Sequence, residues 1–421
     1  MTGQSLQEWL AFIERQHPRA IELGLDRVRA VAERMPLTRP ARRVITVAGT
    51  NGKGSTVAFI ESIARAAGWR VGAYTSPHLL AYNERVRMDG VDARDAQLVE
   101  AFEAVEAARA DTPLTYFEYG TLAALWLFQR SGLDLAVLEV GLGGRLDAVN
   151  IVDADVAVIT TVDLDHQDWL GNDREAIGRE KAGVARAFRP LVLGEDDPPS
   201  SVLGHAYAIG ASTIRAGCDF FFKPVDPTHW QWREIDVELE LPSPQLAAPS
   251  QLRNAATAIA ALRALDDELP SQAYARGIAT ATLPARLQRI VRDGVEIAVD
   301  VAHNPQAARE LHAWLQGALV TGRTWAVFAA LGDKDIAGVV AAVADGIDGW
   351  FLARLEDAGP RGLEVDALAQ RLAGTPAGEG KQFASVAAAL AAALAAARPG
   401  DRVLVFGSFH TAAAALRFLQ G

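Results

Sequence analysis

The feature that most constrains the fold is a regular alternation of short and long apolar patterns along the chain. From Arg43 onward, short runs rich in β-branched side chains alternate with longer segments of helical periodicity. This alternation is typical of βα units around a mostly parallel sheet, so we predict an α/β protein. The strands expected in the first part are Val44–Val47, Val71–Tyr74, Leu135–Val140, Val156–Thr161 and Leu191–Leu193, and the expected helices include Thr56–Ala67 and Tyr119–Gln129.

Two domains are expected from the length of the chain. Its 421 residues exceed what one hydrophobic core usually supports, because domains tend to split beyond about 250–300 residues. We predict an N-terminal domain, residues 1–288, with a small antiparallel appendage within Ser200–Ser250, and a Rossmann-like C-terminal α/β domain, residues 289–421. The strands expected in the C-terminal domain include Glu296–Val301, Trp325–Phe328, Trp350–Leu352 and Val403–Phe406.

Charge and cysteine content exclude several classes of function. The net charge of −11 argues against a nucleic-acid partner, because phosphate backbones are bound by clustered Lys and Arg. The single cysteine, Cys218, excludes an internal disulfide and a multi-cysteine zinc site, and we expect it to be a small buried side chain. The N-terminus lacks the pattern of a secretory signal, and the apolar segment Val386–Ala397 is too short to span a membrane. These observations favour a cytoplasmic protein that acts on small molecules, without a membrane partner.

The segment from Val44 to Thr56 joins an expected strand to an expected helix through a glycine-rich turn. Such a turn lets backbone N–H groups close on phosphate oxygens, and Lys53 adds a positive charge at the start of the helix. The pattern differs from the common phosphate loop, because Val47 stands where the first glycine would fall and Gly54 follows the lysine. We predict a P-loop-type nucleotide site, although a kinase, an ATPase and a ligase would all fit it. Its residues are Gly49, Thr50, Asn51, Gly52, Lys53, Gly54 and Ser55.

Polar residues that follow expected strands are further candidates, because ligands of open α/β sheets bind beyond the carboxyl ends of the strands. Glu139 ends an apolar strand, where an unpaired carboxylate would cost several kcal/mol. Three others have equally simple structural interpretations. His166 could be a satisfied loop residue, Lys181 could be a surface lysine of the expected helix Arg174–Arg186, and Phe117 could be core.

Several further motifs follow the phosphate loop along the chain. They are Tyr74–Leu79, Leu114–Gly120, Leu138–Asp147, Leu164–His166, Arg179–Gly183, Asp300–Pro305, Asp333–Asp335 and Gly407–Thr411. Together with the phosphate loop they resemble one family of the Mur ligase superfamily, the bacterial bifunctional dihydrofolate synthase/folylpolyglutamate synthases. The motifs run from the first βα unit to the last strand, so the resemblance covers nearly the whole chain.

The resemblance implies a role for named residues in this chain. It implies two Mg²⁺ ions, with K⁺ as a further possibility, and a carbamylated Lys181 among the metal ligands. The implied metal ligands are Ser76, Glu139, His166 and Lys181; the implied ATP contacts beyond the loop are Asn254, Arg286 and Asp300; the implied pterin contacts are Thr115, Tyr116, Phe117, Glu118, Leu146, Asp147 and Ala148; and the implied catalytic residues are Lys53, Lys181 and His303.

The second domain departs from the family pattern at one point. The family often has Pro-Gly-Arg before the domain boundary, whereas this chain has Pro284-Ala285-Arg286, which places the local turn in question. Ser408 and His410 are expected near the active crevice, although each could simply cap a helix or turn.

The resemblance also implies the reaction. ATP would activate the carboxylate of dihydropteroate or a reduced folate as an acyl phosphate, and L-glutamate would then form the amide. A monomer is the family-based expectation. Alternatives that remain open are a monofunctional folylpolyglutamate synthase, another Mur-type ligase, and a non-catalytic ATP-dependent switch.

Overall fold

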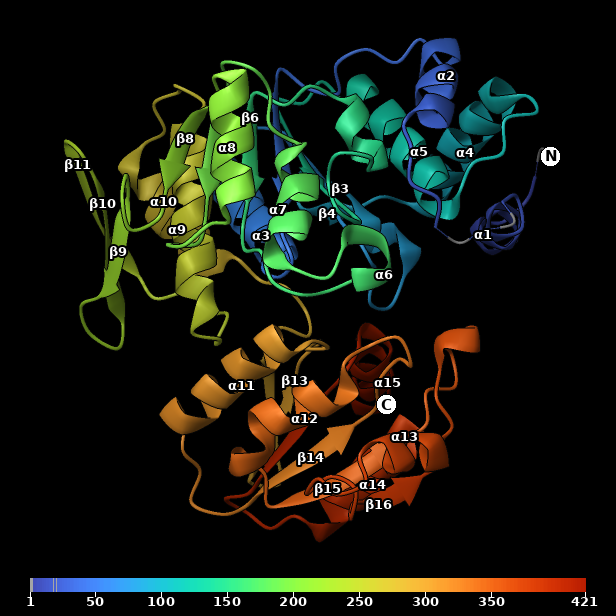
Figure 1. Ribbon diagram of the computed structural model, residues 1–421, viewed down its shortest axis with the longest axis vertical. Helices are drawn as coiled ribbons and strands as arrows, with labels where there is room; N and C mark the ends of the chain where they lie inside the picture. Colours follow the sequence, from blue (N-terminus) through green and yellow to red (C-terminus); the bar gives the residue numbers. More distant parts are fainter. Residues whose placement is uncertain (1–2, 18, 20) are drawn as a thin grey trace. The chain divides into compact units, whose positions relative to one another are not determined.

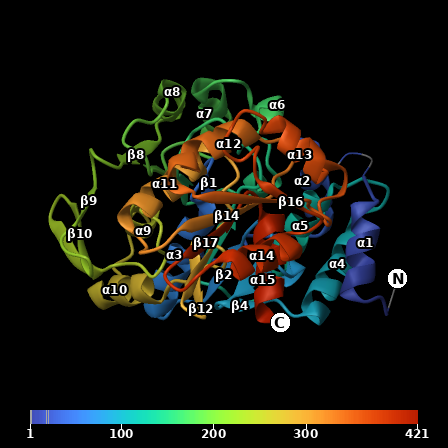
Figure 2. The same cartoon turned by 90° about the horizontal axis from the view of Figure 1, so that it is seen from below.

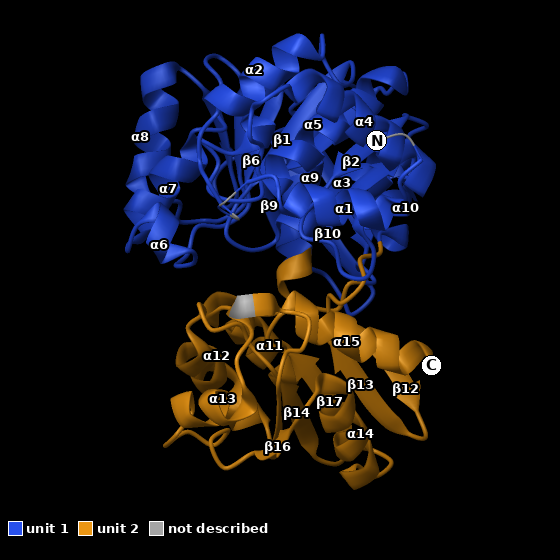
Figure 3. Cartoon of the chain, turned by 90° about the vertical axis from the view of Figure 1, so that its right-hand side faces the viewer, with its two compact units in different colours: residues 1–245, 252–281 blue, residues 246–251, 282–421 orange. Residues whose placement is uncertain are grey.

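The computed structural model describes residues 3–17, 19 and 21–421. The chain divides into two compact units (Figure 3). Unit 1 comprises residues 1–245 and 252–281, and unit 2 comprises residues 246–251 and 282–421. Each unit contains its own sheet, and the sequence-based prediction of an α/β protein with a large, mostly parallel sheet and a second α/β domain is confirmed.

Unit 1 is built on an eight-stranded sheet in the order β4-β3-β2-β5-β1-β6-β7-β8 (Figure 1). All neighbouring pairs from β2 to β8 are parallel, and β3 and β4 continue the sheet in antiparallel fashion at one edge. The strands are β1 (Arg43–Ala48), β2 (Val71–Tyr74), β3 (Val86–Met88), β4 (Val91–Asp92), β5 (Leu135–Glu139), β6 (Val156–Ile159), β7 (Pro190–Leu193) and β8 (Ser212–Arg215).

The central strands of this sheet are buried on both faces, because helices cover both. Val44 and Ala48 of β1 belong to the core shared with the helices α4 and α5, while the alternate residues Ile45 and Val47 are also fully buried. Continuous apolar strands are what a doubly covered parallel sheet requires. The helical elements are α1 (Leu6–Glu14), α2 (Asp26–Arg34), α3 (Lys53–Ala66), η1 (Tyr82–Arg85), α4 (Asp95–Arg109), α5 (Tyr116–Arg130), η2 (Ala148–Ile151), α6 (Gln167–Leu170), α7 (Arg174–Ala182), α8 (Ser200–Ile209), α9 (Ser250–Arg263) and α10 (Ser271–Thr280).

The expected antiparallel appendage is present but shorter than the segment assigned to it. It is a three-stranded antiparallel sheet of β9 (Phe221–Pro224), β10 (His229–Glu234) and β11 (Val237–Pro242), in the order β11-β10-β9. Its Trp232 is fully buried and donates a hydrogen bond through Nε1 to the carbonyl of Ala256 in α9, at 3.2 Å. The preceding residues instead form α8 and β8, and β8 extends the main sheet.

Unit 2 contains a six-stranded sheet in the order β12-β13-β17-β14-β15-β16, in which only the β12–β13 pair is antiparallel among the described residues. Helices α11, α12 and α13 lie on one face of this sheet, and α14 and α15 lie on the other (Figure 2). The elements are β12 (Gln288–Arg292), β13 (Val295–Val299), α11 (Pro305–Gly317), β14 (Thr324–Phe328), α12 (Ile336–Val343), η3 (Ala344–Gly346), β15 (Gly349–Ala353), η4 (Gly359–Arg361), α13 (Val365–Arg371), β16 (Lys381–Phe383), α14 (Val386–Ala396), β17 (Arg402–Phe406) and α15 (Phe409–Gln420).

Two local expectations need correction. Cys218 is exposed rather than buried, because it lies in the turn between β8 and β9, where its N–H donates to the carbonyl of Arg215. The helix expected over Arg174–Arg186 ends at Ala182 and is capped by Gly183. Within the part of the chain that the structure describes, no helix has both the length and the apolar composition needed to cross a membrane.

The close packing of α10 against α3 generates a stability prediction. A Cβ at Gly277 of α10 would overlap the backbone of Ile63 in α3, so Gly277→Ala should lower the free energy of unfolding by about 1–3 kcal/mol through overpacking. Gly204 of α8 is the matched control, because nothing lies within 4 Å of its added Cβ. Gly204→Ala should raise stability by about 0.5–1 kcal/mol, as for an open helical site. Urea denaturation checks both, and equal effects of the two substitutions would contradict the packing argument.

Candidate active site

The phosphate loop connects β1 to α3 and needs glycine at two positions. Gly49 and Gly52 have φ values of 148° and 86°, which L side chains rarely adopt. A Cβ on Gly49 would also overlap the Thr160 side chain, and a Cβ on Gly52 would stand 2.5 Å from Oδ1 of Asn254. The glycines therefore permit both the turn and the close approach of neighbouring segments.

The lysine of this loop folds back over the turn. Lys53 is the first residue of α3, and its Nζ donates to the carbonyls of Gly49 at 3.0 Å and Thr50 at 3.2 Å. The ammonium group is thus held beside the backbone N–H groups at the start of a helix. A helix N-terminus with an adjacent lysine is a suitable site for nucleotide phosphates.

The segment that follows β6 fixes the loop from the side. The N–H of Thr50 donates to the carbonyl of Thr161 at 2.8 Å, and the Oγ1 of Thr50 exchanges hydrogen bonds with the backbone of Asp163, both at 3.0 Å. The Oγ1 of Thr160 donates to the carbonyl of Asn51 at 2.6 Å. Sequence reasoning identified Thr50 but not Thr160 and Thr161, which hold the loop in a defined position.

Asn254 comes from a distant part of the sequence to the same loop. It lies in α9, 5% exposed, with its side-chain amide against Gly52. The structure thus brings this predicted ATP contact beside the phosphate loop.

Ser76 and Glu139, two of the predicted metal ligands, lie together at the carboxyl edge of the sheet. Glu139 ends β5 and is 4% exposed, and its Oε2 accepts a hydrogen bond from the N–H of Ser76 at 3.2 Å, just beyond β2. Mg²⁺ prefers oxygen ligands and usually takes one or two carboxylates together with phosphates. A buried carboxylate beside a serine, at the edge that carries the phosphate loop, fits such an ion. No group of three or more His, Cys, Asp or Glu residues poised to hold a metal occurs among the described residues.

His166 and Lys181, the other two predicted ligands, differ in burial. His166 precedes α6 with φ of 52°, its side chain is 34% exposed, and its Nε2 lies 4.0 Å from Oδ2 of Asp165. Lys181 of α7 is 3% exposed, so the interpretation as a surface lysine is wrong. Burial, together with the positive charge of Lys53, lowers the pKa of Lys181 to about 7, against the opposing effect of Asp165. Burial therefore favours the neutral form of this amine.

The start of α5 supplies the first predicted pterin segment. Thr115 and Glu118 form a capping box, in which the Oγ1 of Thr115 accepts from the N–H of Glu118 at 3.2 Å and the Oε2 of Glu118 accepts from the N–H of Thr115 at 2.8 Å. The other oxygen of Glu118 accepts from Nη2 of Arg27 at 2.9 Å. The Glu118 carboxylate thus caps α5 and holds Arg27. The ring of Phe117 packs against Gly141 of the facing loop.

The second predicted pterin segment is organised around Asp147. Its carboxylate is 3% exposed and accepts hydrogen bonds from the N–H groups of Leu142 at 2.9 Å and Val149 at 3.1 Å. Burial raises the pKa of Asp147 to about 7, although the backbone hydrogen bonds oppose this shift. The N–H of Gly24 donates to the carbonyl of the adjacent Leu146 at 3.4 Å, so an N-terminal segment also reaches this loop.

One partly buried acid at the same edge was missed by sequence reasoning. Glu195 follows β7, accepts from the N–H of Val162 at 3.0 Å and pairs with Arg174 at 3.2 Å. Burial raises the pKa of Glu195 to about 7. The rule that singled out Glu139, an acid after an apolar strand, would also have found Glu195.

The predicted site residues of unit 2 gather beyond β13 and β17. Asp300 is 8% exposed, and its carboxylate accepts from the N–H groups of Leu287 at 2.8 Å and Ala302 at 2.7 Å. Burial raises the pKa of Asp300, while the charge of Arg286 opposes the shift. The Arg286 guanidinium lies 5.1 Å from the Phe409 ring centre, and the His303 ring lies 6.2 Å from it. Their roles stay predictions.

Ser408 and the turn before Arg286 are the other two features of unit 2 about which the sequence raised expectations. Ser408 caps α15 by accepting from the N–H of Thr411 at 3.0 Å, so the capping interpretation describes its geometry. The residue before Arg286 is alanine, yet it adopts a conformation typical of glycine. Ala285 has φ of 54°, in the left-handed region that favours glycine, and the structure accommodates its methyl group in a fully buried position.

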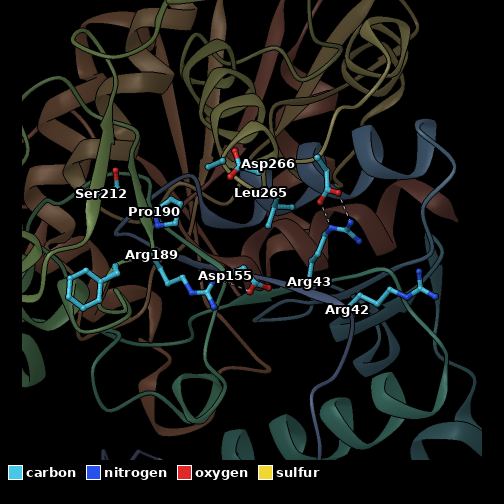
Figure 4. Close-up of a pocket in the computed structure, with 11 residues that line it drawn as sticks. Arg42, Arg43, Asp155, Arg189, Pro190, Ser212, Leu265 and Asp266 are labelled. Carbon is cyan, nitrogen blue, oxygen red and sulfur yellow. Dashed lines mark hydrogen bonds and ion pairs between the residues drawn. The ribbon is translucent and has the colours of Figure 1, made fainter.

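A separate hollow of about 660 Å³ lies at the amino ends of the strands in unit 1, where no site was predicted (Figure 4). Arg42, Arg43 and Arg189 line it, but Arg43 is already paired with Asp267 and Arg189 lies 3.9 Å from Asp155. Its charges are largely compensated within the protein, so we assign it no role.

Comparison with known proteins covers nearly the whole chain. Residues 47–262 match the Mur ligase middle domain, and residues 285–409 match the Mur ligase, glutamate ligase domain. The chain is 48% identical to the dihydrofolate synthase/folylpolyglutamate synthase of Escherichia coli strain K12, with 99% of this chain and 96% of the relative covered.

Two solved structures give the same result. The structure of E. coli FolC in complex with DHPP and ADP matches with a TM-score of 0.94 and 47% identity, covering 99% of this chain and 98% of that chain. A bifunctional folylpolyglutamate synthase/dihydrofolate synthase with Mn, AMPPNP and L-glutamate bound matches with a TM-score of 0.92 and 46% identity, covering 100% and 99%. The chain therefore belongs to the Mur ligases, within the family of dihydrofolate synthase/folylpolyglutamate synthases.

Proposed function

We propose that this chain is an ATP-dependent ligase that joins L-glutamate to dihydropteroate and to reduced folates. The observation that carries the proposal is the full-length likeness to structures that hold ADP with DHPP and, separately, AMPPNP with L-glutamate. The phosphate loop, the buried Glu139 and the buried Lys181 at the same sheet edge support it. A cytoplasmic location and a monomeric state stay predictions.

The reaction needs activation, because a carboxylate is a poor electrophile. An oxygen of the acceptor carboxylate attacks the γ-phosphorus of ATP, the bond to the leaving ADP breaks, and an acyl phosphate forms. The amine of L-glutamate then attacks the acyl carbon, the carbon–oxygen bond to phosphate breaks, and the amine proton is released. The products are the amide, ADP and phosphate.

The residues of this chain supply position and charge for these steps. Lys53 and the loop N–H groups would hold the β- and γ-phosphates, and Asn254 would contact the nucleotide beside Gly52. A divalent ion, as in the Mn-bound relative, would screen phosphate charge when held by Ser76, Glu139, His166 and a carbamylated Lys181. Two Mg²⁺ sites and a K⁺ site are family-based proposals.

The buried position of Lys181 suits this modification. Only an unprotonated amine can attack CO₂, and burial favours that form at Lys181. A carbamate would place a carboxylate-like group where the unmodified side chain could not bind a cation. Asp147, Ala148 and Phe117 would line the pterin.

The direct test of the proposal is ADP release in the presence of ATP, L-glutamate and dihydropteroate, with product mass as a second readout. We expect ADP release to require both acid and amino acid, and the product to gain one glutamate. A non-catalytic ATP-dependent switch would release ADP without either. A monofunctional folylpolyglutamate synthase would accept a reduced folate but not dihydropteroate.

Lys53→Ala should abolish most ligase activity while the protein stays folded. Loss of a preorganised charge at a transferring phosphoryl group typically lowers kcat by about 10²–10³-fold. Lys223→Ala is the control, because that lysine is exposed on β9. Steady-state kinetics and thermal unfolding check the pair, and near-normal turnover by Lys53→Ala would remove the phosphate-loop assignment.

Lys181→Ala should lose activity and regain part of it when short carboxylic acids such as formate or acetate are added. The cavity left by the side chain would admit a small carboxylate in place of the carbamate oxygens. Lys53→Ala serves as the control, since the same acids should not restore its activity. Full activity of Lys181→Ala without added acid would exclude a role for this lysine.

A further inference from the structure

Arg85 is a buried arginine of unit 1 without a carboxylate partner. It is 9% exposed, and its Nε donates to Nδ1 of His78 at 2.9 Å. The guanidinium lies 5.3 Å from the ring centre of Tyr82 and 5.4 Å from that of Tyr116. Arg85 forms no ion pair with any Asp or Glu of the residues that the structure describes. The positive charge is therefore surrounded by aromatic faces and one imidazole.

Two partly buried arginines of unit 1, less buried than Arg85, are neutralised. Arg87, two residues later, pairs with Glu61 at 2.9 Å, and Arg27 pairs with Glu118 at 2.9 Å. A buried charge without a counter-charge is unfavourable by several kcal/mol, so such groups are normally paired. Arg85 is thus an exception that packing does not explain.

The free end of the Arg85 side chain is open to a ligand. Neither Nη atom has a hydrogen-bond partner among the described residues, and neither is among the unpartnered polar atoms sealed from solvent. Two parallel N–H groups on a planar fork match the two oxygens of a carboxylate. The Nε contact with His78 and the two rings fix the plane of that fork.

The neighbours of Arg85 belong to both halves of the candidate site. Its carbonyl accepts from the N–H of Thr75 at 2.9 Å, which ties η1 to the segment that carries Ser76. Tyr116 belongs to the start of α5, in the predicted pterin segment. The guanidinium therefore lies between the segment that follows β2 and the wall proposed for the acceptor.

We propose that Arg85 binds a carboxylate of a substrate, either that of the pterin-type acid or one of the two carboxylates of L-glutamate. This inference rests on the proposed function, because both substrates of that ligation are carboxylates. The bound carboxylate supplies the counter-charge that the protein itself lacks. Arg85 then contributes to selecting acids over their amides, in addition to holding the substrate.

The test measures selection between matched acids and amides in Arg85→Gln, Arg85→Lys and the wild type. One arm compares L-glutamate with L-glutamine and L-isoglutamine, and the other compares pteroate with its carboxamide. Titration calorimetry gives Kd for each compound in the presence of AMPPNP, and steady-state kinetics gives KM for ATP, L-glutamate and dihydropteroate. The arm that responds identifies which carboxylate Arg85 binds.

Arg85→Gln should weaken binding of one acid by about 10- to 100-fold, the effect of losing a charge-assisted hydrogen bond, and should leave its amide unaffected. The KM for ATP should not change. Arg85→Lys should keep part of the selection, because it retains the charge but not the fork. Arg87→Gln is the control, at a partly buried arginine two residues away that is paired with Glu61, and it should lower the thermal midpoint while keeping the wild-type preference for acids.

Two outcomes would overturn the inference or separate it from the proposed function. If Arg85→Gln folds normally and prefers both acids over their amides as the wild type does, Arg85 does not bind a substrate carboxylate. If the wild type forms no amide product, the proposed function fails, whereas the calorimetric comparison still decides whether Arg85 recognises carboxylates.

Discussion

The parallel pairing of β1 with β5 and β6 is the constraint on which the candidate site depends. In this register Val47 lies opposite Glu139, and Ala48 lies opposite Ile159. Parallel strands end at the same edge, so the phosphate loop after β1, the carboxylate that ends β5 and the threonines after β6 must meet there. A shift of one residue would turn Glu139 to the opposite face of the sheet. Burial of these strands on both faces makes such a shift costly.

Ionisable side chains at this edge of the sheet are shielded from water, which disfavours their charged forms. Burial raises the pKa of Asp147 and of Glu195 to about 7 and lowers that of Lys181 to about 7. These shifts run in opposite directions for acids and a base, which is the signature of desolvation. Burying ionisable groups lowers the stability of the folded protein, but it favours the uncharged forms that some reactions need. Groups with such shifted pKa values cluster at functional sites.

Arginines of unit 1 differ in whether a carboxylate of the protein neutralises them. Arg27 joins the N-terminal segment to the capping carboxylate of Glu118, and Arg87 neutralises Glu61. Each of these pairs is complete within the protein. The Arg85 fork is complete only with a ligand, and the aromatic rings beside it restrict where that ligand can lie.

The sequence alone determined the local elements and the chemistry of the loop. Apolar runs identified β2 to the residue and the other named strands within two residues, because burial on both faces requires continuous apolar segments. Glycines at Gly49 and Gly52 indicated the turn, because few other residues adopt its dihedral angles. Only the tertiary structure showed that Asn254 lies against Gly52, that Lys181 is buried, that Cys218 is exposed and that Arg85 lacks a carboxylate. The local sequence pattern predicts whether a segment forms a strand, a helix or a turn. The properties of these four residues instead depend on which distant segments of the chain pack beside each of them.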